Sequence, residues 1–253
     1  MSIEKPTIVI FDMDGTTVRH LNPRLLSALE FLDSASYKCA KLFAWAFKRG
    51  RKGPIVPEWH DPEWLNKNKK KPRLIVHRVL HKVRRKPVEQ IVQPFPGLYD
   101  VLDFLKANNV PIALVSNGLG KGYGHDILKK FDLVDYFKAT TFREDIQHSK
   151  PHPEPILLTL KRMDVTITSE DVVWYIGDRH KDIAAAIEAN KHVDAKITPI
   201  AFALSAAVAA MEKNLGPDHI IMSYHDMFDQ LKLMFEDIDV QTMSPKDPPK
   251  ISA

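Results

Sequence analysis

The chain has 253 residues, of which 44% are hydrophobic and 27% are charged, the usual composition of a soluble globular protein. No run approaches the roughly 18 consecutive apolar residues that a membrane span requires, and the N-terminal stretch lacks a signal-peptide pattern. A single cysteine, Cys39, excludes an intramolecular disulfide and fits a reducing compartment. These features predict a soluble, cytoplasmic protein of enzyme size.

The net charge of +4 is unevenly distributed along the chain. Residues 38–87 contain 16 Lys and Arg against 3 acidic residues, whereas the rest of the chain has 20 basic and 29 acidic residues. So basic a segment favours contact with an anionic partner, although a solvated surface would also explain it.

The first predicted element is a β-strand over residues 7–11, a short β-branched apolar run typical of a buried parallel strand. Asp12 and Asp14 follow it directly, and Gly15 favours a turn there. Two carboxylates at a strand end can divide nucleophilic and acid–base roles between them, or share a divalent cation. The alternative is a loop whose solvated aspartates cap the next helix.

Residues 18–93 interrupt the regular pattern. Asn22 and Pro23 predict a helix start, Gly50 its end, and residues 73–86 form a second helical pattern with apolar and basic stripes on opposite faces. We therefore expect an all-helical, basic cap over residues 18–93, inserted into a core of residues 1–17 and 94–240. The last residues, 241–253, contain three prolines and little apolar content, which predicts a disordered tail.

Strand and helix patterns alternate after the insertion. Strands are expected over residues 111–115, 172–176, 197–202 and 220–222, and helices over 98–108, 123–131, 153–163, 182–190 and 205–214. This order predicts an α/β fold with a doubly wound parallel sheet, Rossmann-like, with helices on both faces. In such sheets, ligands bind at the carboxyl ends of the strands.

Further polar groups follow these predicted strands. Ser116 and Asn117 follow the second strand and suit an anion, while Lys150 precedes a predicted helix and offers a fixed ammonium group. Asp178 and Asp182 follow the third strand. Carboxylates for a metal, donors for phosphate and one lysine are the groups that phosphoryl transfer requires.

In order and context, FDMDGTT, LVSNG, Lys150 within SKPHPEP, and IGDRHKD resemble the four motifs of the haloacid dehalogenase-like (HAD) hydrolase superfamily. The insertion between the first two motifs is similar to the helical cap of its phosphoglycolate phosphatase and β-phosphoglucomutase branch. The resemblance covers everything except the insertion and the tail.

The resemblance implies a Mg²⁺-dependent phosphatase that hydrolyses a small phosphomonoester through an aspartyl-phosphate. Asp12 would be the nucleophile, and Asp14 the general acid and then base. The phosphoryl group would be bound by Gly15, Ser116, Asn117 and Lys150. The metal would be held by Asp12, Asp178, the backbone carbonyl of Asp14 and, directly or indirectly, Asp182.

The resemblance leaves the substrate open beyond a small, strongly anionic phosphorylated metabolite. Asp14 argues against dehalogenation, because a halide leaves without a proton. Arg19 stands where this branch commonly has an aspartate, and the basic cap matches no pattern of the branch. A phosphomutase of the same family is one alternative. Another is a polyanion-binding protein whose basic, aromatic-containing cap contacts nucleic acid or a membrane.

Overall fold

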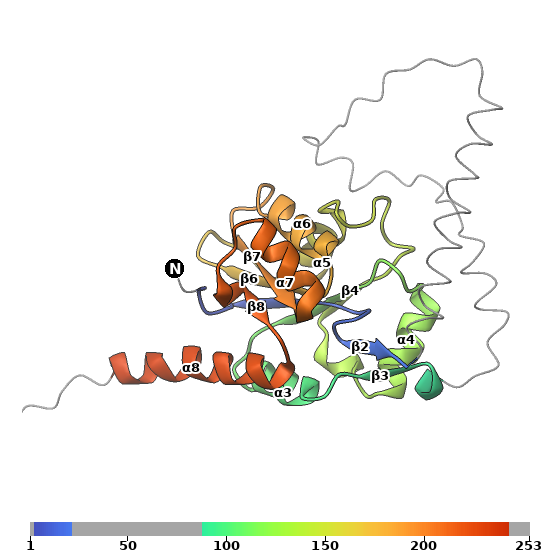
Figure 1. Ribbon diagram of the computed structural model, residues 1–253, viewed down its shortest axis with the longest axis horizontal. Helices are drawn as coiled ribbons and strands as arrows, with labels where there is room; N and C mark the ends of the chain where they lie inside the picture. Colours follow the sequence, from blue (N-terminus) through green and yellow to red (C-terminus); the bar gives the residue numbers. More distant parts are fainter. Residues whose placement is uncertain (1–2, 22–87, 243–253) are drawn as a thin grey trace, which may run out of the picture.

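The computed structural model describes residues 3–21 and 88–242 (Figure 1). These residues form a six-stranded parallel sheet in the order β5-β4-β1-β6-β7-β8. The strands are β1 (Ile8–Asp12), β4 (Ile112–Val115), β5 (Ala139–Thr141), β6 (Val172–Gly177), β7 (Lys196–Phe202) and β8 (Ile220–Ile221). β1 therefore lies inside the sheet, with β4 and β6 as its neighbours.

Helices cover both faces of this sheet. One face carries α3 (Leu98–Ala107), α4 (Lys121–Lys130) and α8 (Tyr224–Thr242). The other carries α5 (Glu154–Arg162) and α6 (His180–Ala189), and α7 (Ala203–Glu212) packs against α6 and β7. Short 3₁₀ helices lie at Val88–Gln90, Val134–Tyr136 and Pro217–His219. The predicted doubly wound α/β fold is confirmed.

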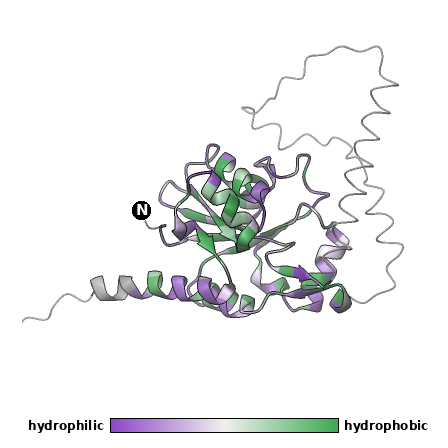
Figure 2. Ribbon diagram, viewed as in Figure 1, coloured by the Kyte–Doolittle hydropathy of each residue, from purple (hydrophilic) through white to green (hydrophobic). Residues whose placement is uncertain are grey.

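The alternation of side chains along β1 explains why the strand is apolar throughout. Val9 and Phe11 pack into the core beneath α3, α4 and α8, whereas Ile8 and Ile10 pack into the core beneath α5 and α6. Because both faces are covered, every residue of β1 is buried. Figure 2 shows these hydrophobic strands at the centre of the described region.

A second, two-stranded sheet joins β2 (Val18–His20) antiparallel to β3 (Val92–Pro94). β2 and the first two residues of β3 fall within residues 18–93, predicted to be an all-helical cap, so these ends form strands where helix was predicted. Backbone pairing between the two ends of the insertion determines their structure, and a helical period cannot reveal such pairing. The predicted cap helices and the basic residues 38–87 lie outside the described residues.

Two more elements differ from prediction. β5 was not predicted, because a run of only three residues, two of them threonines, carries no apolar signal. α8 was also not predicted; it packs on α3, and it includes Gln241 and Thr242, which were assigned to the disordered tail. The remainder of that tail lies outside the described residues.

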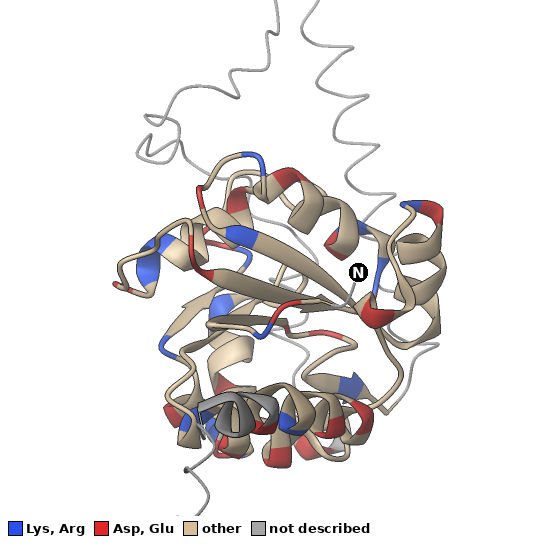
Figure 3. Ribbon diagram, turned by 90° about the vertical axis from the view of Figure 1, so that its left-hand side faces the viewer, with Lys and Arg blue, Asp and Glu red and all other residues tan. Residues whose placement is uncertain are grey.

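Two surface properties bear on the partners of the protein. No helix among residues 3–21 and 88–242 combines the length and apolar character that crossing a membrane requires. Charged residues of both signs are spread along the described helices and loops (Figure 3).

Candidate active site

The first acidic motif forms a tight loop at the carboxyl end of β1. The carbonyl of Asp12 accepts hydrogen bonds from the hydroxyl of Thr17, at 2.7 Å, and from its N–H, at 3.3 Å. Gly15 has a φ of +83°, a left-handed conformation that favours glycine. A Cβ at Gly15 would also lie 2.1 Å from Oδ2 of Asp178. The loop thus brings the first and fourth motifs into contact, and only glycine leaves room for it.

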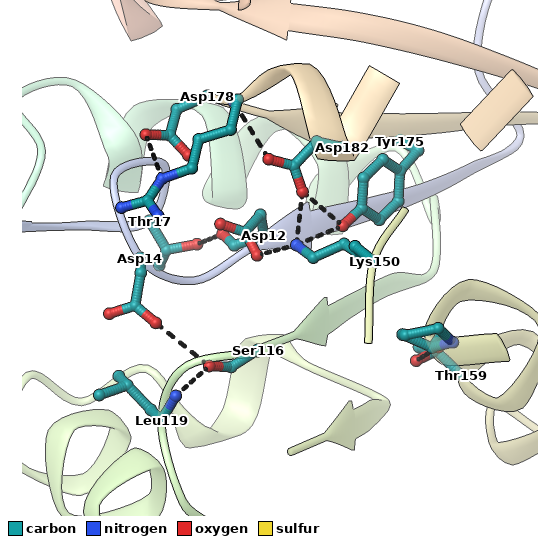
Figure 4. Close-up of polar contacts among 12 residues, drawn as sticks. Asp12, Asp14, Thr17, Ser116, Leu119, Lys150, Thr159, Tyr175, Asp178 and Asp182 are labelled. Carbon is teal, nitrogen blue, oxygen red and sulfur yellow. Dashed lines mark hydrogen bonds and ion pairs between the residues drawn. The ribbon is translucent and has the colours of Figure 1, made fainter. Parts of the chain in front are cut away.

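Lys150 lies at the centre of a buried polar network (Figure 4). Its ammonium group contacts one carboxylate oxygen each of Asp12 and Asp182 and donates to the hydroxyl of Tyr175 at 2.9 Å. The Tyr175 hydroxyl in turn donates to Asp182 at 3.2 Å. The side chains of all four residues are buried. Residues 12, 150, 175 and 182 thus converge on one point although they come from three separate parts of the chain.

The charges of this network are strongly coupled. Burial alone would lower the pKa of Lys150, but the carboxylates of Asp12 and Asp182 raise it well above its usual value, so the ammonium form persists. Burial raises the pKa of Asp12, against the opposing effect of Lys150, and the neighbouring carboxylates raise it further. A single cation therefore does not fully compensate the acidic groups gathered here.

Asp178 is only partly compensated, since its Oδ2 lies 3.8 Å from Nε of Arg179 while its other oxygen has no such partner. Its Oδ1 is buried and has no hydrogen-bond partner. Burial, followed by the charge of Asp182, raises the pKa of Asp178 to about 6. Oxygens of Asp12, Asp178 and Asp182 lie within 4.8 Å of one another, and carboxylate oxygens are the ligands that hard divalent cations prefer. These three residues fit a divalent cation.

Asp14 has a different environment from Asp12. The hydroxyl of Ser116 donates to Oδ2 of Asp14 at 3.2 Å, and Nε2 of His20 lies 3.1 Å from Oδ1. Ser116 is itself held by the backbone N–H of Leu119, which donates to its Oγ at 2.9 Å. Asp14 is partly exposed, with a side chain 17% accessible to solvent, so this carboxyl group is within reach of a bound molecule.

The loop that carries Lys150 is fixed by an acidic side chain. The buried carboxylate of Glu154, at the start of α5, accepts the backbone N–H groups of Gln147 and His148, both at 2.7 Å. A carboxylate in the first turn of a helix also interacts favourably with the helix dipole. These hydrogen bonds tie the segment just before Lys150 to the start of α5.

The structure brings together most of the predicted site residues. Asp12, Lys150, Asp178 and Asp182 form one cluster, with Gly15 against Asp178. The hydroxyl of Ser116 contacts Asp14. The Oδ1 atom of Asn117 is buried without a hydrogen-bond partner. The proposed roles of these residues toward phosphate and metal, including that of the Asp14 carbonyl, stay predictions.

Sequence reasoning missed two residues of the site. Tyr175 was assigned to a buried strand; its hydroxyl was the available signal, because a buried tyrosine needs a hydrogen-bond partner. His20 was assigned to the cap, and no pattern in the sequence connects it with Asp14.

Comparisons with known proteins identify the family of this chain. Residues 9–195 match the family model of haloacid dehalogenase-like hydrolases, and the chain belongs to this family. An alignment of 92 residues with the phosphoglycolate phosphatase of Escherichia coli K12 has 34% identity and covers 36% of this chain and 35% of that protein. An alignment of 139 residues with the pyrophosphatase PpaX of Oceanobacillus iheyensis has 27% identity and covers 55% of this chain and 60% of that protein.

Solved structures show the same fold. A HAD-superfamily hydrolase from Ehrlichia chaffeensis aligns with a TM-score of 0.55 at 21% identity, over 92% of this chain and 100% of that chain. A HAD family hydrolase from Deinococcus radiodurans, with bound phosphate and sodium, aligns with a TM-score of 0.57 at 17% identity, over 92% of this chain and 98% of that chain. The alignments with the two curated relatives span only 35% and 60% of their lengths.

Proposed function

We propose that this protein is a phosphoric monoester hydrolase that acts through an aspartyl-phosphate on Asp12. The observation that carries the proposal is the pair of carboxylates at the end of β1 in a member of the HAD hydrolase family. Asp12 is buried against the ammonium group of Lys150, whereas Asp14 is partly exposed and contacts the hydroxyl of Ser116 and the imidazole of His20. Two carboxyl groups in such different environments suit a nucleophile and a proton donor.

In the first step, a carboxylate oxygen of Asp12 attacks the phosphorus atom and forms a P–O bond. The bond between phosphorus and the ester oxygen breaks, and the leaving alkoxide takes the proton of the Asp14 carboxyl group. In the second step, the Asp14 carboxylate accepts a proton from water as its oxygen attacks the phosphorus. Inorganic phosphate leaves, the Asp12 carboxylate is restored and Asp14 is again protonated.

The remaining site residues bind and orient the phosphoryl group in this proposal. Lys150 neutralises its charge while keeping Asp12 in place, and the Ser116 hydroxyl and the Asn117 side chain supply polar contacts. The Asn117 amide would contact a phosphoryl oxygen through its Nδ2 group, because its Oδ1 only accepts hydrogen bonds. The left-handed turn at Gly15 lets its backbone approach the phosphoryl group closely.

We propose Mg²⁺ as the cofactor, held by Asp12 and Asp178 with Asp182 in support and the Asp14 carbonyl as a further ligand. The orphaned Oδ1 of Asp178 and the raised pKa values of Asp12 and Asp178 support a cation here. When bound, the ion would offset the charge that develops on the phosphoryl oxygens. It would also offset the repulsion between these carboxylates, so that Asp12 can act in its ionised form.

The proposed substrate is a small, strongly anionic phosphorylated metabolite in the cytoplasm. Phosphoglycolate and pyrophosphate are the first compounds to test, because relatives of this chain carry those names. The experiment measures phosphate release from a panel of phosphomonoesters and these two compounds, with Mg²⁺ and with EDTA. We expect metal-dependent release that Asp12→Asn abolishes; no release from any compound would contradict the proposal.

The panel also separates hydrolysis from the phosphomutase alternative. A mutase would move the phosphoryl group between positions of a sugar phosphate with no net release of phosphate. Product analysis of sugar phosphates in the same reactions distinguishes the two. Contact of the basic residues 38–87 with nucleic acid or a membrane concerns residues outside those that the structure describes.

A further inference from the structure

The carboxyl group of Asp14 is held from two sides. Ser116 donates to Oδ2, and Nε2 of His20 lies 3.1 Å from Oδ1. When Asp14 is ionised its carboxylate only accepts hydrogen bonds, so for that state we assign a proton to Nε2 of the imidazole. Gly118 lies beside the same group, where a Cβ would come within 3.2 Å of Oδ2. Contacts on both oxygens fix the plane of the carboxyl group.

The imidazole of His20 is placed by the small antiparallel sheet. His20 is the last residue of β2 and pairs with Val92 of β3. The next residue, Leu21, donates its N–H to Ile91 at 2.9 Å, and the side chain of His20 is only 11% exposed. At the other end of β2, the carbonyl of Val18 accepts the N–H of Gly15 at 2.9 Å. The backbone therefore fixes His20 relative to the loop that carries Asp14.

We propose that His20 is a positioning residue that orients Asp14 for proton transfer. This inference rests on the proposed phosphatase function and concerns the acid–base half of its site. His20 acts through Asp14, because the structure places its Nε2 against that carboxylate. It holds the carboxyl group in the direction from which the proton passes to the leaving oxygen, and later from water to Asp14.

The chemistry of the first step makes this role measurable. An alkyl ester releases a basic alkoxide, which needs the proton of Asp14 as the bond breaks. A p-nitrophenyl ester releases a weakly basic phenolate, which leaves without it. Misplacing Asp14 should therefore slow the first step for alkyl esters and spare it for the aryl ester. A general loss of folding or of phosphate binding would slow both equally.

The experiment compares kcat/KM of wild type, His20→Ala and His20→Gln for the best alkyl phosphomonoester and for p-nitrophenyl phosphate. We expect His20→Ala to lower the alkyl value about tenfold, the effect of losing one hydrogen bond to a charged group, and the aryl value by less than about twofold. His20→Gln, which keeps a donor, should recover most of the alkyl activity. An equal loss for both esters would overturn the inference.

His219→Ala is the matched control. His219 is also a partly buried histidine with one hydrogen bond, from Nδ1 to the carbonyl of Pro199 at 2.7 Å, but it lies at the β7–β8 side of the sheet. We expect both esters to be hydrolysed as by wild type. A selective loss of alkyl activity in this variant would mean that the selectivity does not report on Asp14.

A readout that needs no turnover separates this inference from the function on which it rests. Crystal structures of wild type and of His20→Ala should show the Asp14 side chain fixed in the first and turned or disordered in the second. An unchanged Asp14 in His20→Ala would overturn the positioning role whatever the kinetics. Failure of the phosphatase function would appear elsewhere, as esters that wild type does not hydrolyse or that Asp12→Asn hydrolyses equally well.

Discussion

The two halves of the site, around Asp12 and around Asp14, are built differently. Asp12 lies in a closed network with Lys150, Asp182 and Tyr175, in which every partner is buried and most carry charge. Asp14, two residues further along, is partly exposed and meets the hydroxyl of Ser116 and the imidazole of His20. The same residue type thus stands in two different environments, because tertiary partners rather than local sequence set them.

Loss of the Asp12 carboxylate should have the largest effect. Asp12→Asn removes the nucleophile, and we expect kcat to fall by about 10⁴-fold or more. The side chain keeps its shape and Lys150 keeps its contact with Asp182, so circular dichroism should show a folded protein. Appreciable residual turnover would show that the covalent step does not occur on Asp12.

Asp14→Asn tests the half of the site around Asp14. The amide cannot exchange the proton, and we expect kcat to fall by about 10²–10⁴-fold, the usual contribution of general acid–base catalysis. Steady-state kinetics with the best phosphomonoester measures it. Because Asp14 lies outside the Lys150 network, thermal stability should change less than in Asp12→Asn. Unchanged kinetics would remove Asp14 from the mechanism.

The carboxylates of Asp12, Asp178 and Asp182 should make cation binding depend on pH. With the pKa of Asp178 at about 6, protons compete with the ion below that value. Asp12, whose pKa is also raised, competes in the same way, so the affinity for Mg²⁺, measured by calorimetry, should rise by about tenfold or more per pH unit as the pH increases toward 6. An affinity that is constant between pH 5 and pH 7 would contradict a ligand role for Asp178.

Asp178 should also make the stability of the metal-free protein depend on pH. A carboxyl pKa that is higher in the folded than in the unfolded state stabilises the fold when protonated, and this contribution is lost as the pH rises through about 6. Between pH 4 and pH 7, the free energy of unfolding, measured with urea in EDTA, should fall by up to about 3 kcal/mol more in the wild type than in Asp178→Asn. Parallel profiles for the two proteins would refute this.

The smallest effect is expected for Tyr175→Phe. The substitution removes the hydroxyl that bonds to Lys150 and Asp182 and leaves the ring in place, so we expect a loss of about 1 kcal/mol in the free energy of unfolding and about fivefold in kcat. Tyr136→Phe is the control, because its hydroxyl bonds to Asp103, at 2.7 Å, outside the Lys150 network. Equal effects on kcat would show that Tyr175 has no special connection with Lys150.

The sequence predicted the parts of this molecule that follow from local pattern. The strands at β1, β4, β6 and β7 are buried apolar runs, and polar residues at their carboxyl ends must share one edge of a parallel sheet. Asp12, Asp178 and Asp182 could therefore be placed together in advance, whereas Lys150 precedes a predicted helix and follows no predicted strand.

Other features depend on contacts that no local pattern encodes. The hydroxyl of Tyr175 reaches Lys150 only because β6 lies beside β1 and the loop before α5 folds over that face. His20 meets Asp14 because β3, from the far end of a long insertion, pairs with β2. β5 is too short to be recognised without β4 beside it.

The central claim is that Asp12 carries the phosphoryl group, and the most direct test is to trap it there. Wild-type protein mixed with p-nitrophenyl phosphate and Mg²⁺, quenched in acid and digested, should yield a peptide that contains Asp12 and has gained one phosphoryl group. Asp12→Asn treated identically should yield none. A phosphoryl group found on another residue, or on the Asp12→Asn protein, would contradict the account.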